Sequence, residues 1–463
     1  MRACTALGNV TMTKTSSLGY FALASASPTS TSATSVSALI DSPLMRNAGR
    51  DLLSLALMDA RNHTLHLFSQ LQKSLENVDF AAAHIANVNP PLWALGHVGW
   101  HQEWFIGRNM QRALGSRAEA AHARLASIEP GADRWWSPAN TPQQARWTME
   151  LPGVDHTRAY LLETLESTLD MLDRVGQGSG SAGNPDDALY FYRLCLFHED
   201  MLGEALVCSA QTLGLSFDLA LREAYTPAPL NPREPLLIPA TVWQLGHSPD
   251  AGFAFDNEKP QHPIAVPEFE IDAQPVNWSQ FVEFVDDGGY DQPELWAEGG
   301  WQWLQGFESG PANEGGEGRR APRYVEQIGV ASGAVMQTRF GHPMRMLGNQ
   351  SAMHLSWWEA DAWCRWAGRR LPAEVEWEVA AHVAGRRGFK WGEVWEWTGT
   401  TFRPYPGFKP GPDASYSQAA FGTHKVLRGA SFATRARMKN SKYRNFQLPE
   451  RDDMFCGFRS CAL

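Results

Sequence analysis

Residues 95–105 read LGHVGWHQEWF, and residues 189–206 read LYFYRLCLFHEDMLGEAL. In both stretches apolar residues recur at intervals of three and four, which is the period of an amphipathic helix. Positions i and i+4 share one face of a helix, so His97 and His101 are expected to point the same way. His198 lies on the second predicted helix. Two helices could therefore present three imidazoles to one metal ion.

These three histidines suggest a metal centre with open coordination positions. Three imidazole nitrogens leave room for substrate or oxygen on a first-row metal such as Fe(II) or zinc. The ordinary alternative is that each histidine is a satisfied core or surface residue of its helix, since the chain contains 14 histidines. The spacing alone leaves both interpretations open.

The surrounding sequence predicts a helical domain. Four amphipathic segments follow one another, at residues 48–75, 90–110, 157–175 and 188–215. Such segments predict a four-helix bundle, whose core is a usual place for a metal held by facing helices. QGSGSAGNPDD, at residues 177–187, has the composition of a flexible loop, and the Ser/Thr/Ala-rich residues 1–45 are expected to form a disordered leader.

A change of character divides the chain. The proline-rich stretch YTPAPLNPREP, at residues 225–235, is unsuited to a helix and predicts a linker. Beyond it, short β-like runs alternate with Gly, Pro and Asn turns, and one convincing helix occurs in SWWEADAWCRWAGR. We expect the bundle over residues 46–228 and an α+β domain with much irregular loop over residues 236–463.

Composition excludes several classes of function. The formal net charge is −10 and no run of Lys or Arg occurs, which argues against binding to nucleic acid. No stretch of eighteen apolar residues suggests a membrane span. The six cysteines include no CxxC pair, so a reducing cytoplasm is the expected compartment. A globular cytoplasmic protein that binds neither nucleic acid nor a membrane is the expectation.

Long blocks of this sequence resemble the ergothioneine sulfoxide synthases. The blocks are GFAFDNEKPQHPIAVPEFEID, PVNWSQFVEFVDDGGY, SWWEADAWCRWAGRRLPAEVEWE, GEVWEWTGTTFRPYPGF and VLRGASFATRARMKNSKYRNFQLPERDDMFCGFR. The resemblance covers nearly everything from Asn47 onward. It implies an N-terminal DinB-like four-helix bundle and a C-terminal domain like formylglycine-generating enzyme, which has a C-type-lectin-like fold. It also implies non-haem Fe(II) as cofactor, O2 as co-substrate and hercynine as substrate.

The metal ligands depart from the family pattern. Family members take one histidine from a GHxxW-like window and two from an HxxxH pair on the fourth helix. Here His97 and His198 match, but Leu202 replaces the last histidine. The resemblance therefore implies His97, His101 and His198 as ligands, with His101 supplying the missing nitrogen. Glu199 and Glu204 are weaker candidates for a carboxylate ligand, and a role beside the ligands is the alternative for His101.

The residues expected to hold the chalcogen donor also differ. Relatives that use γ-glutamylcysteine carry a PRxxR-like pattern, whereas this chain has Gln143 at the first arginine and keeps Arg146. Their RNWD-like motif reads YRNFQ here, which gives Asn445, Phe446 and Gln447 as candidate substrate contacts. Losing one cation and one anion removes charge-assisted contacts to a zwitterionic peptide. Neutral amides suit a polyhydroxylated donor, because they offer hydrogen bonds of both senses.

These departures favour the selenoneine synthase branch of the family, which joins selenium from a selenosugar to hercynine. Two alternatives remain: formation of a carbon–sulfur bond from a thiol donor, and a metal-free ligand-binding homologue. Tyr405 matches the tyrosine that relatives place near the iron, although Phe402 could occupy the more critical position. Simple packing of Tyr405 in a proline-containing turn is the alternative to a catalytic role.

Overall fold

The structure is a computed structural model that describes residues 36–75, 88–176, 185–248, 251–308, 318–329 and 334–463. The chain forms two compact units. The first comprises Met1–Leu206 with Arg435–Arg437, and the second comprises Val207–Thr434 with Met438–Leu463. The division falls inside a helix, so the proline-rich stretch predicted as the domain linker lies within the second unit.

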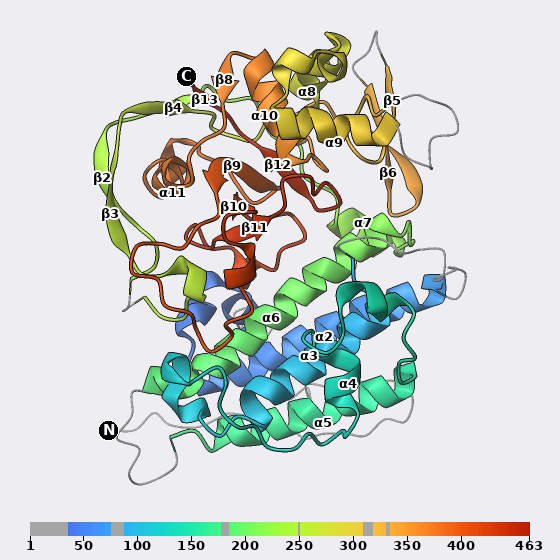
Figure 1. Cartoon of the computed structure of the whole chain (residues 1–463), viewed down its shortest axis with the longest axis vertical. Coiled ribbons are helices and arrows are strands. Elements are labelled where there is room, and N and C mark those ends of the chain that lie inside the picture. The colour runs from blue at the N-terminus through green and yellow to red at the C-terminus, as the bar shows by residue number, and fades with distance from the viewer. Residues whose placement is uncertain (1–35, 76–87, 177–184, 249–250, 309–317, 330–333) are drawn as a thin grey trace. The chain divides into compact units, whose positions relative to one another are not determined.

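The first unit is built from the helices α2 (Arg50–Leu75), α3 (Pro91–Gln102), α4 (Ala132–Trp136), α5 (Val154–Asp173) and α6 (Pro185–Thr212) (Figure 1). Shorter turns are η1 (Pro43–Asn47), η2 (Glu103–Gly107), η3 (Arg112–Arg117) and η4 (Gln143–Trp147). The four long helices coincide with the four predicted amphipathic segments, and a DinB-like kinship stays a prediction. None of the described helices is long and apolar enough to cross a membrane.

Two predictions of disorder are wrong in part. Residues 1–35 lie outside the described part of the chain, but residues 36–40 are helical and residues 43–47 form η1. Ser42 caps η1 by accepting a hydrogen bond from the Leu44 amide, which is the local stabilisation that composition did not reveal. Of the predicted loop at residues 177–187, the first eight residues lie outside the description and the last three begin α6.

Two glycines allow α3 to approach its neighbours closely. A Cβ atom on Gly96 would lie 2.0 Å from Trp136, and one on Gly99 would lie 2.8 Å from Tyr160. Glycine inside a helix costs about 1 kcal/mol of helix stability relative to alanine. At both positions this cost permits close packing against an aromatic ring that a Cβ atom would prevent. The result is a core in which Trp93, Trp136, Tyr160 and Leu161 are all buried. His97 and His101 are therefore carried by a tightly held helix.

The second unit contains four sheets in the described residues. Their orders are β1-β4-β13-β8, β11-β10-β9-β12, β2-β3 and β5-β6-β7. The strands are β1 (Leu236–Ile238), β2 (Thr241–Leu245), β3 (His262–Val266), β4 (Phe269–Ile271), β5 (Val325–Gly329), β6 (Ala334–Arg339), β7 (His342–Met346), β8 (Arg369–Arg370), β9 (Trp395–Thr401), β10 (Lys425–Gly429), β11 (Asn445–Gln447), β12 (Cys456–Phe458) and β13 (Cys461–Ala462).

Helices are more numerous in this unit than the sequence predicted. Its helices beyond α6 are α7 (Leu219–Ala224), α8 (Trp278–Asp286), α9 (Glu298–Glu308), α10 (Trp357–Trp366) and α11 (Glu374–Val383). The sequence indicated one convincing helix and the others were missed, among them α8, whose start carries a capping box formed by Asn277 and Gln280. The predicted helix is α10, and Ser356 and Glu359 form a capping box at its start.

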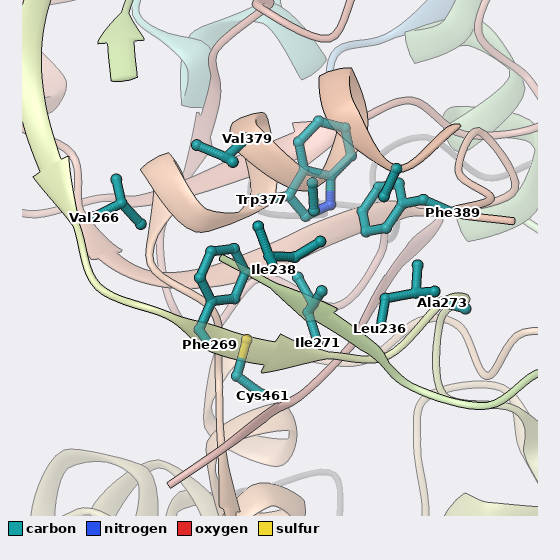
Figure 2. Packing of buried hydrophobic residues seen from close by; sticks show 12 residues of the cluster. Leu236, Ile238, Val266, Phe269, Ile271, Ala273, Trp377, Val379, Phe389 and Cys461 are labelled. Atoms are coloured by element: carbon teal, nitrogen blue, oxygen red, sulfur yellow. The ribbon is translucent and has the colours of Figure 1, made fainter. Parts of the chain in front are cut away.

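The hydrophobic core of the second unit joins one sheet to α11 (Figure 2). Ile238 and Ile271 come from paired strands β1 and β4, and both are essentially inaccessible to solvent. Trp377 of α11 and Phe389 close the core from the helical side. Burying a large apolar side chain stabilises the fold by about 1.5–3 kcal/mol. This packing places Glu374 and Glu378, on the same helix, in the interior.

Candidate functional site

The structure brings the three predicted histidines together in the first unit. The ring centroid of His97 lies 6.1 Å from that of His101 and 5.2 Å from that of His198. The rings of His101 and His198 stack 3.4 Å apart with an interplanar angle of 3°. His97 and His101 are buried, and His198 is partly buried. Convergence of α3 and α6 at these residues follows the sequence prediction.

A backbone carbonyl fixes the orientation of His97. Its Nδ1 lies 2.9 Å from the carbonyl oxygen of Trp136. A carbonyl can only accept, so Nδ1 carries the hydrogen and Nε2 keeps the lone pair of the neutral ring. Trp93 and Trp100 flank the ring at centroid distances of 4.8 and 5.5 Å. This is the arrangement of a histidine whose other nitrogen serves as a metal ligand.

Burial keeps the other two histidines neutral. Desolvation lowers the pKa of His101 and of His198 well below the ordinary value, and the neighbouring histidines lower it further. Neutral imidazoles retain the lone pairs that metal ions need. The chemistry of this donor set therefore fits Fe(II) or zinc.

The ring orientations are not those of a metal complex. Imidazole lone pairs lie in the ring plane, so parallel rings 3.4 Å apart do not direct both lone pairs at one point. Within the described ranges, no group of three or more His, Cys, Asp or Glu side chains is arranged to hold a metal. The ligand set His97, His101 and His198 stays a prediction that requires one of the stacked rings to turn.

The carboxylates considered as alternative ligands are less suited. Both oxygens of Glu199 accept hydrogen bonds from Arg61, at 2.8 and 3.3 Å. Glu204 follows His198 by six residues, which places it about 120° away around α6. Sequence reasoning missed Arg61, because an arginine inside an amphipathic helix carries no sign of a partner 138 residues away.

Gln143 and Arg146 lie together near the start of α3, and both donate hydrogen bonds to other residues of the first unit. Gln143 donates to the carbonyl oxygen of Val88 at 2.7 Å. Arg146 donates to Asn89 at 2.8 Å and lies 3.8 Å from the centroid of the Trp93 ring. Burial lowers the pKa of Arg146 to about 10, so it stays charged at neutral pH. Their contact with a substrate stays a prediction.

Asn445, Phe446 and Gln447 form β11, opposite Leu427, Val426 and Lys425 of β10. Phe446 stacks on Phe402, with ring centroids 4.2 Å apart and an angle of 10°. Asn445 accepts a hydrogen bond from the Phe446 amide at 2.8 Å. All three strand residues are partly buried, so each retains some accessible surface. The structure therefore groups these candidates on one strand.

The amide of Gln447 has a defined orientation. Arg451 Nη1 donates to Gln447 Oε1 at 2.7 Å, and Asp453 holds the same guanidinium at 2.8 Å. A guanidinium has no acceptor, so the amide oxygen must face it and the NH2 group must face away. Gln447 accordingly offers hydrogen-bond donors to its other neighbours. Sequence alone could not distinguish this from the opposite orientation.

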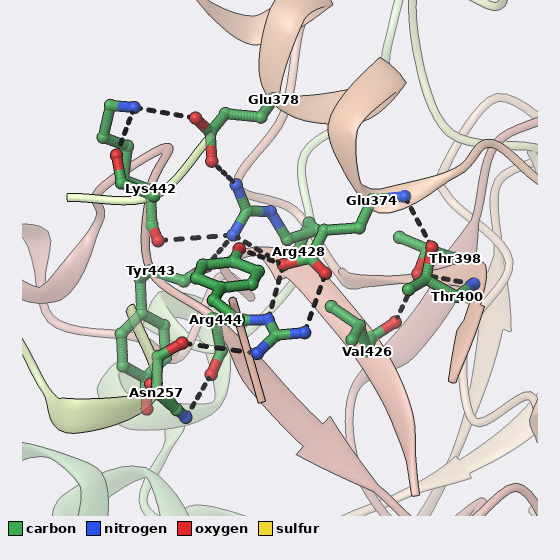
Figure 3. A network of polar contacts seen from close by, with 12 residues as sticks. Asn257, Glu374, Glu378, Thr398, Thr400, Val426, Arg428, Lys442, Tyr443 and Arg444 are labelled. Atoms are coloured by element: carbon green, nitrogen blue, oxygen red, sulfur yellow. Dashed lines mark hydrogen bonds and ion pairs between the residues drawn. The ribbon is translucent and has the colours of Figure 1, made fainter. Parts of the chain in front are cut away.

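Tyr405 contacts a buried charge network that the sequence did not reveal. Figure 3 shows the members Glu374, Arg428 and Arg444 of that network. The Tyr405 hydroxyl donates to Glu374 at 2.8 Å, and burial raises its pKa well above the ordinary value. Glu374 also accepts from Arg444 at 2.6 and 3.0 Å, and Arg428 pairs with Glu378. Arg428 and Arg444 additionally donate to loop carbonyls. A catalytic role for Tyr405 stays a prediction.

Replacing Tyr405 with phenylalanine distinguishes a structural role, the hydrogen bond to Glu374, from the proposed catalytic role of the phenol. The substitution removes one hydrogen bond to a buried carboxylate, which is expected to lower the free energy of unfolding by about 1.5–3 kcal/mol. Chemical denaturation measures that loss, and steady-state kinetics at a temperature where the variant is folded measures catalysis. A folded variant with unchanged kcat would contradict a catalytic phenol.

Comparison with known proteins gives the family. Residues 223–393 and 390–462 match the sulfatase-modifying factor enzyme 1-like domain, which spans just over half of the 463 residues. The chain is 28% identical to the hercynine oxygenase of Mycolicibacterium smegmatis, covering 89% of this chain and 98% of the relative. For that of Mycolicibacterium thermoresistibile the identity is 29%, with 88% and 94% covered.

A second kind of relative matches a smaller share of the chain. The formylglycine-generating enzyme of Streptomyces coelicolor is 30% identical, covering 36% of this chain and 52% of the relative. The residues that the family model matches make up most of the second unit. The chain therefore belongs to the sulfatase-modifying factor enzyme 1-like family.

Proposed function

We propose that this protein is a non-haem Fe(II), O2-dependent selenoneine synthase, which joins selenium from a selenosugar to the imidazole of hercynine. The observation that carries the proposal is the cluster of His97, His101 and His198, in which two imidazoles are kept neutral by burial. The relatives that align along most of the chain are named hercynine oxygenases, which supports hercynine as the substrate.

The three histidines are the residues that would hold the metal. Bound Fe(II) would supply binding and reduction of O2 and a coordination position for the chalcogen. Replacing an imidazole C–H and a selenol Se–H by a C–Se bond releases two protons and two electrons, which O2 accepts. If the product leaves as a selenoxide, two further electrons come from selenium, and the second oxygen atom leaves as water.

The residues of β11 would bind and orient the organic substrates. Phe446 is partly exposed, and one of its faces is supported by Phe402. An aromatic face suits a trimethylammonium group such as that of hercynine. Asn445 supplies a polar side chain beside it, and Gln447 offers N–H donors to oxygen acceptors such as sugar hydroxyls. Gln143 and Arg146 are proposed as further donor contacts.

Orientation of the Gln447 amide favours a hydroxylated donor over one that presents an ammonium group. An ammonium group needs an acceptor, and Arg451 already occupies one of the two lone pairs of the Gln447 oxygen. A hydroxyl oxygen, in contrast, can accept from the amide NH2 group. This observation supports the selenosugar, while the names of the relatives keep a thiol donor, and thus a carbon–sulfur bond, as the second candidate.

Gln447→Asp provides a direct test of this preference. The carboxylate would pair with Arg451 and would offer no N–H donor, so kcat/KM for the selenosugar is expected to fall about tenfold, the equivalent of one hydrogen bond. KM should rise more than kcat falls, because the contact is to the bound donor. An unchanged kcat/KM in a variant of normal thermal stability would remove Gln447 from the donor site.

Product analysis tests the function as a whole. Fe(II)-loaded protein is given hercynine and air, with a selenosugar and γ-glutamylcysteine offered in competition, and the adducts are identified by mass spectrometry. A selenium-containing hercynine adduct is the expected result. A sulfoxide adduct alone would return the chain to carbon–sulfur bond formation. Absence of both adducts, together with absence of bound iron, would favour a metal-free ligand-binding protein.

A further inference from the structure

A single buried arginine connects all four long helices of the first unit. Arg61 belongs to α2, and only 1% of its surface is exposed. Its guanidinium donates to Glu199 of α6 at 2.8 Å, to Gln102 of α3 at 2.9 Å and to the carbonyl oxygen of Leu161 in α5. The planar fork of a guanidinium reaches several acceptors in fixed directions, which the single ammonium group of lysine does not do.

The two side chains that Arg61 holds are the immediate neighbours of the candidate ligands. Gln102 follows His101, and Glu199 follows His198. Successive residues of a helix are related by about 100° of rotation and 1.5 Å of rise. Fixing Gln102 and Glu199 on one guanidinium therefore fixes how far α3 and α6 are turned about their axes. The same rotation decides where the rings of His101 and His198 lie.

The contacts of Arg61 are strong because they are buried. Gln102 and Glu199 are each only 2% exposed. Removing one partner of a buried ion pair is strongly destabilising, because the remaining charge is left without compensation. The oxygen of Gln102 must face Arg61, since a guanidinium accepts no hydrogen bond. Its Nε2 atom has no hydrogen-bond partner among the described residues, so Arg61 orients this amide.

We propose that Arg61 is a positioning residue for the histidine cluster. Through Gln102 and Glu199 it sets the register of α3 against α6, and it thereby fixes the backbone positions from which the rings of His101 and His198 extend. The rings stack 3.4 Å apart in the structure, and one of them would turn from these positions to bind a metal. The inference rests on the proposed function in so far as the cluster binds Fe(II). The arrangement of the rings themselves depends on Arg61 whether or not a metal is bound.

Arg193 offers a matched control on the same helix as His198. It is 2% exposed, and it donates to the carbonyl oxygen of Ala48 at 2.9 Å and to Asp186 at 2.9 Å. Arg61→Lys and Arg193→Lys therefore both remove a buried guanidinium from the first unit. The variant Glu199→Gln keeps Arg61 and the shape of the site, and it serves if Arg61→Lys fails to fold.

The test uses the full chain and two measurements. The first records the imidazole 15N and 1H signals of the metal-free proteins, with His101 and His198 identified through His→Gln variants. The second measures the affinity for Fe(II) alone without oxygen, and for Co(II) alone through its visible spectrum. Arg61→Lys is expected to shift both ring signals and to weaken metal binding about tenfold, the lower end of the effect seen for partners of metal ligands.

The outcomes distinguish this inference from the proposed function. Arg193→Lys is expected to leave the ring signals and the Co(II) spectrum unchanged, even where it lowers thermal stability as much as Arg61→Lys. If Arg61→Lys leaves the ring signals of His101 and His198 as they are in the wild type, the positioning role is overturned. A wild-type protein that binds neither Fe(II) nor Co(II) contradicts the proposed function, while the ring signals still decide the role of Arg61.

Discussion

Replacing His198 with alanine is expected to lower the rate of product formation by more than about 100-fold, because changes to the partners of metal ligands alone cost 10–100-fold. The substitution removes one of the three gathered imidazoles and also the ring that stacks on His101 at 3.4 Å. Bound iron per chain, measured after anaerobic loading and gel filtration, should fall in parallel with the rate. Both readouts are needed to tell two defects apart. A loss of metal binding lowers the rate and the iron content together, whereas a defect in the chemistry lowers the rate per bound iron.

His63→Ala is the control for this substitution. His63 lies on α2 in the same unit, and burial and the neighbouring Arg435 lower its pKa to about 4. It is thus another largely desolvated histidine, but no ring contact joins it to the cluster among those seen in the described residues. Iron content and activity should survive its loss. If His198→Ala retains full iron content, or if His63→Ala loses iron equally, the proposed ligand set is wrong.

Replacing Glu374 with glutamine is expected to lower the free energy of unfolding by about 3–5 kcal/mol. The carboxylate is buried against two arginines, at 2.6 Å from Arg444 and 3.5 Å from Arg428 (Figure 3). It also accepts a hydrogen bond from Tyr405. Neutralising it leaves both guanidinium groups short of negative charge in the interior. Urea denaturation followed by tryptophan fluorescence measures the loss.

The dependence on pH gives the same substitution a second signature. The two arginines lower the pKa of Glu374 against the opposing effect of burial. A carboxyl group whose pKa is lower in the folded than in the unfolded state stabilises the fold above its unfolded pKa, and that stabilisation is lost as the pH falls through the folded value. Stability of the wild type should therefore fall on acidification, and Glu374→Gln should flatten that fall.

Arg365→Gln is the control for the charge network. This arginine pairs with Asp361 one turn earlier on α10, and its side chain is 47% exposed. Solvent screens such a pair, so its loss should cost less than about 1 kcal/mol. Equal losses of stability for Glu374→Gln and Arg365→Gln would show that burial does not amplify the contribution of Glu374.

Local pattern was sufficient to predict the four long helices of the first unit, but not the short α4. The segments at residues 48–75 and 188–215 were correct to within a few residues for α2 and α6, because a long amphipathic period is written into consecutive residues. The same period placed His97 and His101 on one face, and the structure confirms that His198 meets them. The helices α8, α9 and α11 escaped prediction, although α8 carries a local signal in the capping box that Asn277 and Gln280 form at its start.

The sequence by itself determined that helical and mixed segments follow one another and that three histidines lie on two amphipathic helices, because both properties depend on residues close together in the chain. Only the tertiary structure decided three contacts. Arg61 donates hydrogen bonds to the residues that follow His101 and His198. Arg451 orients the Gln447 amide, and Tyr405 donates to Glu374. Each of these depends on a donor meeting an acceptor in three dimensions, with Arg61 and Glu199 separated by 138 positions. Burial then gives these pairings their strength, and burial is a property of the folded chain.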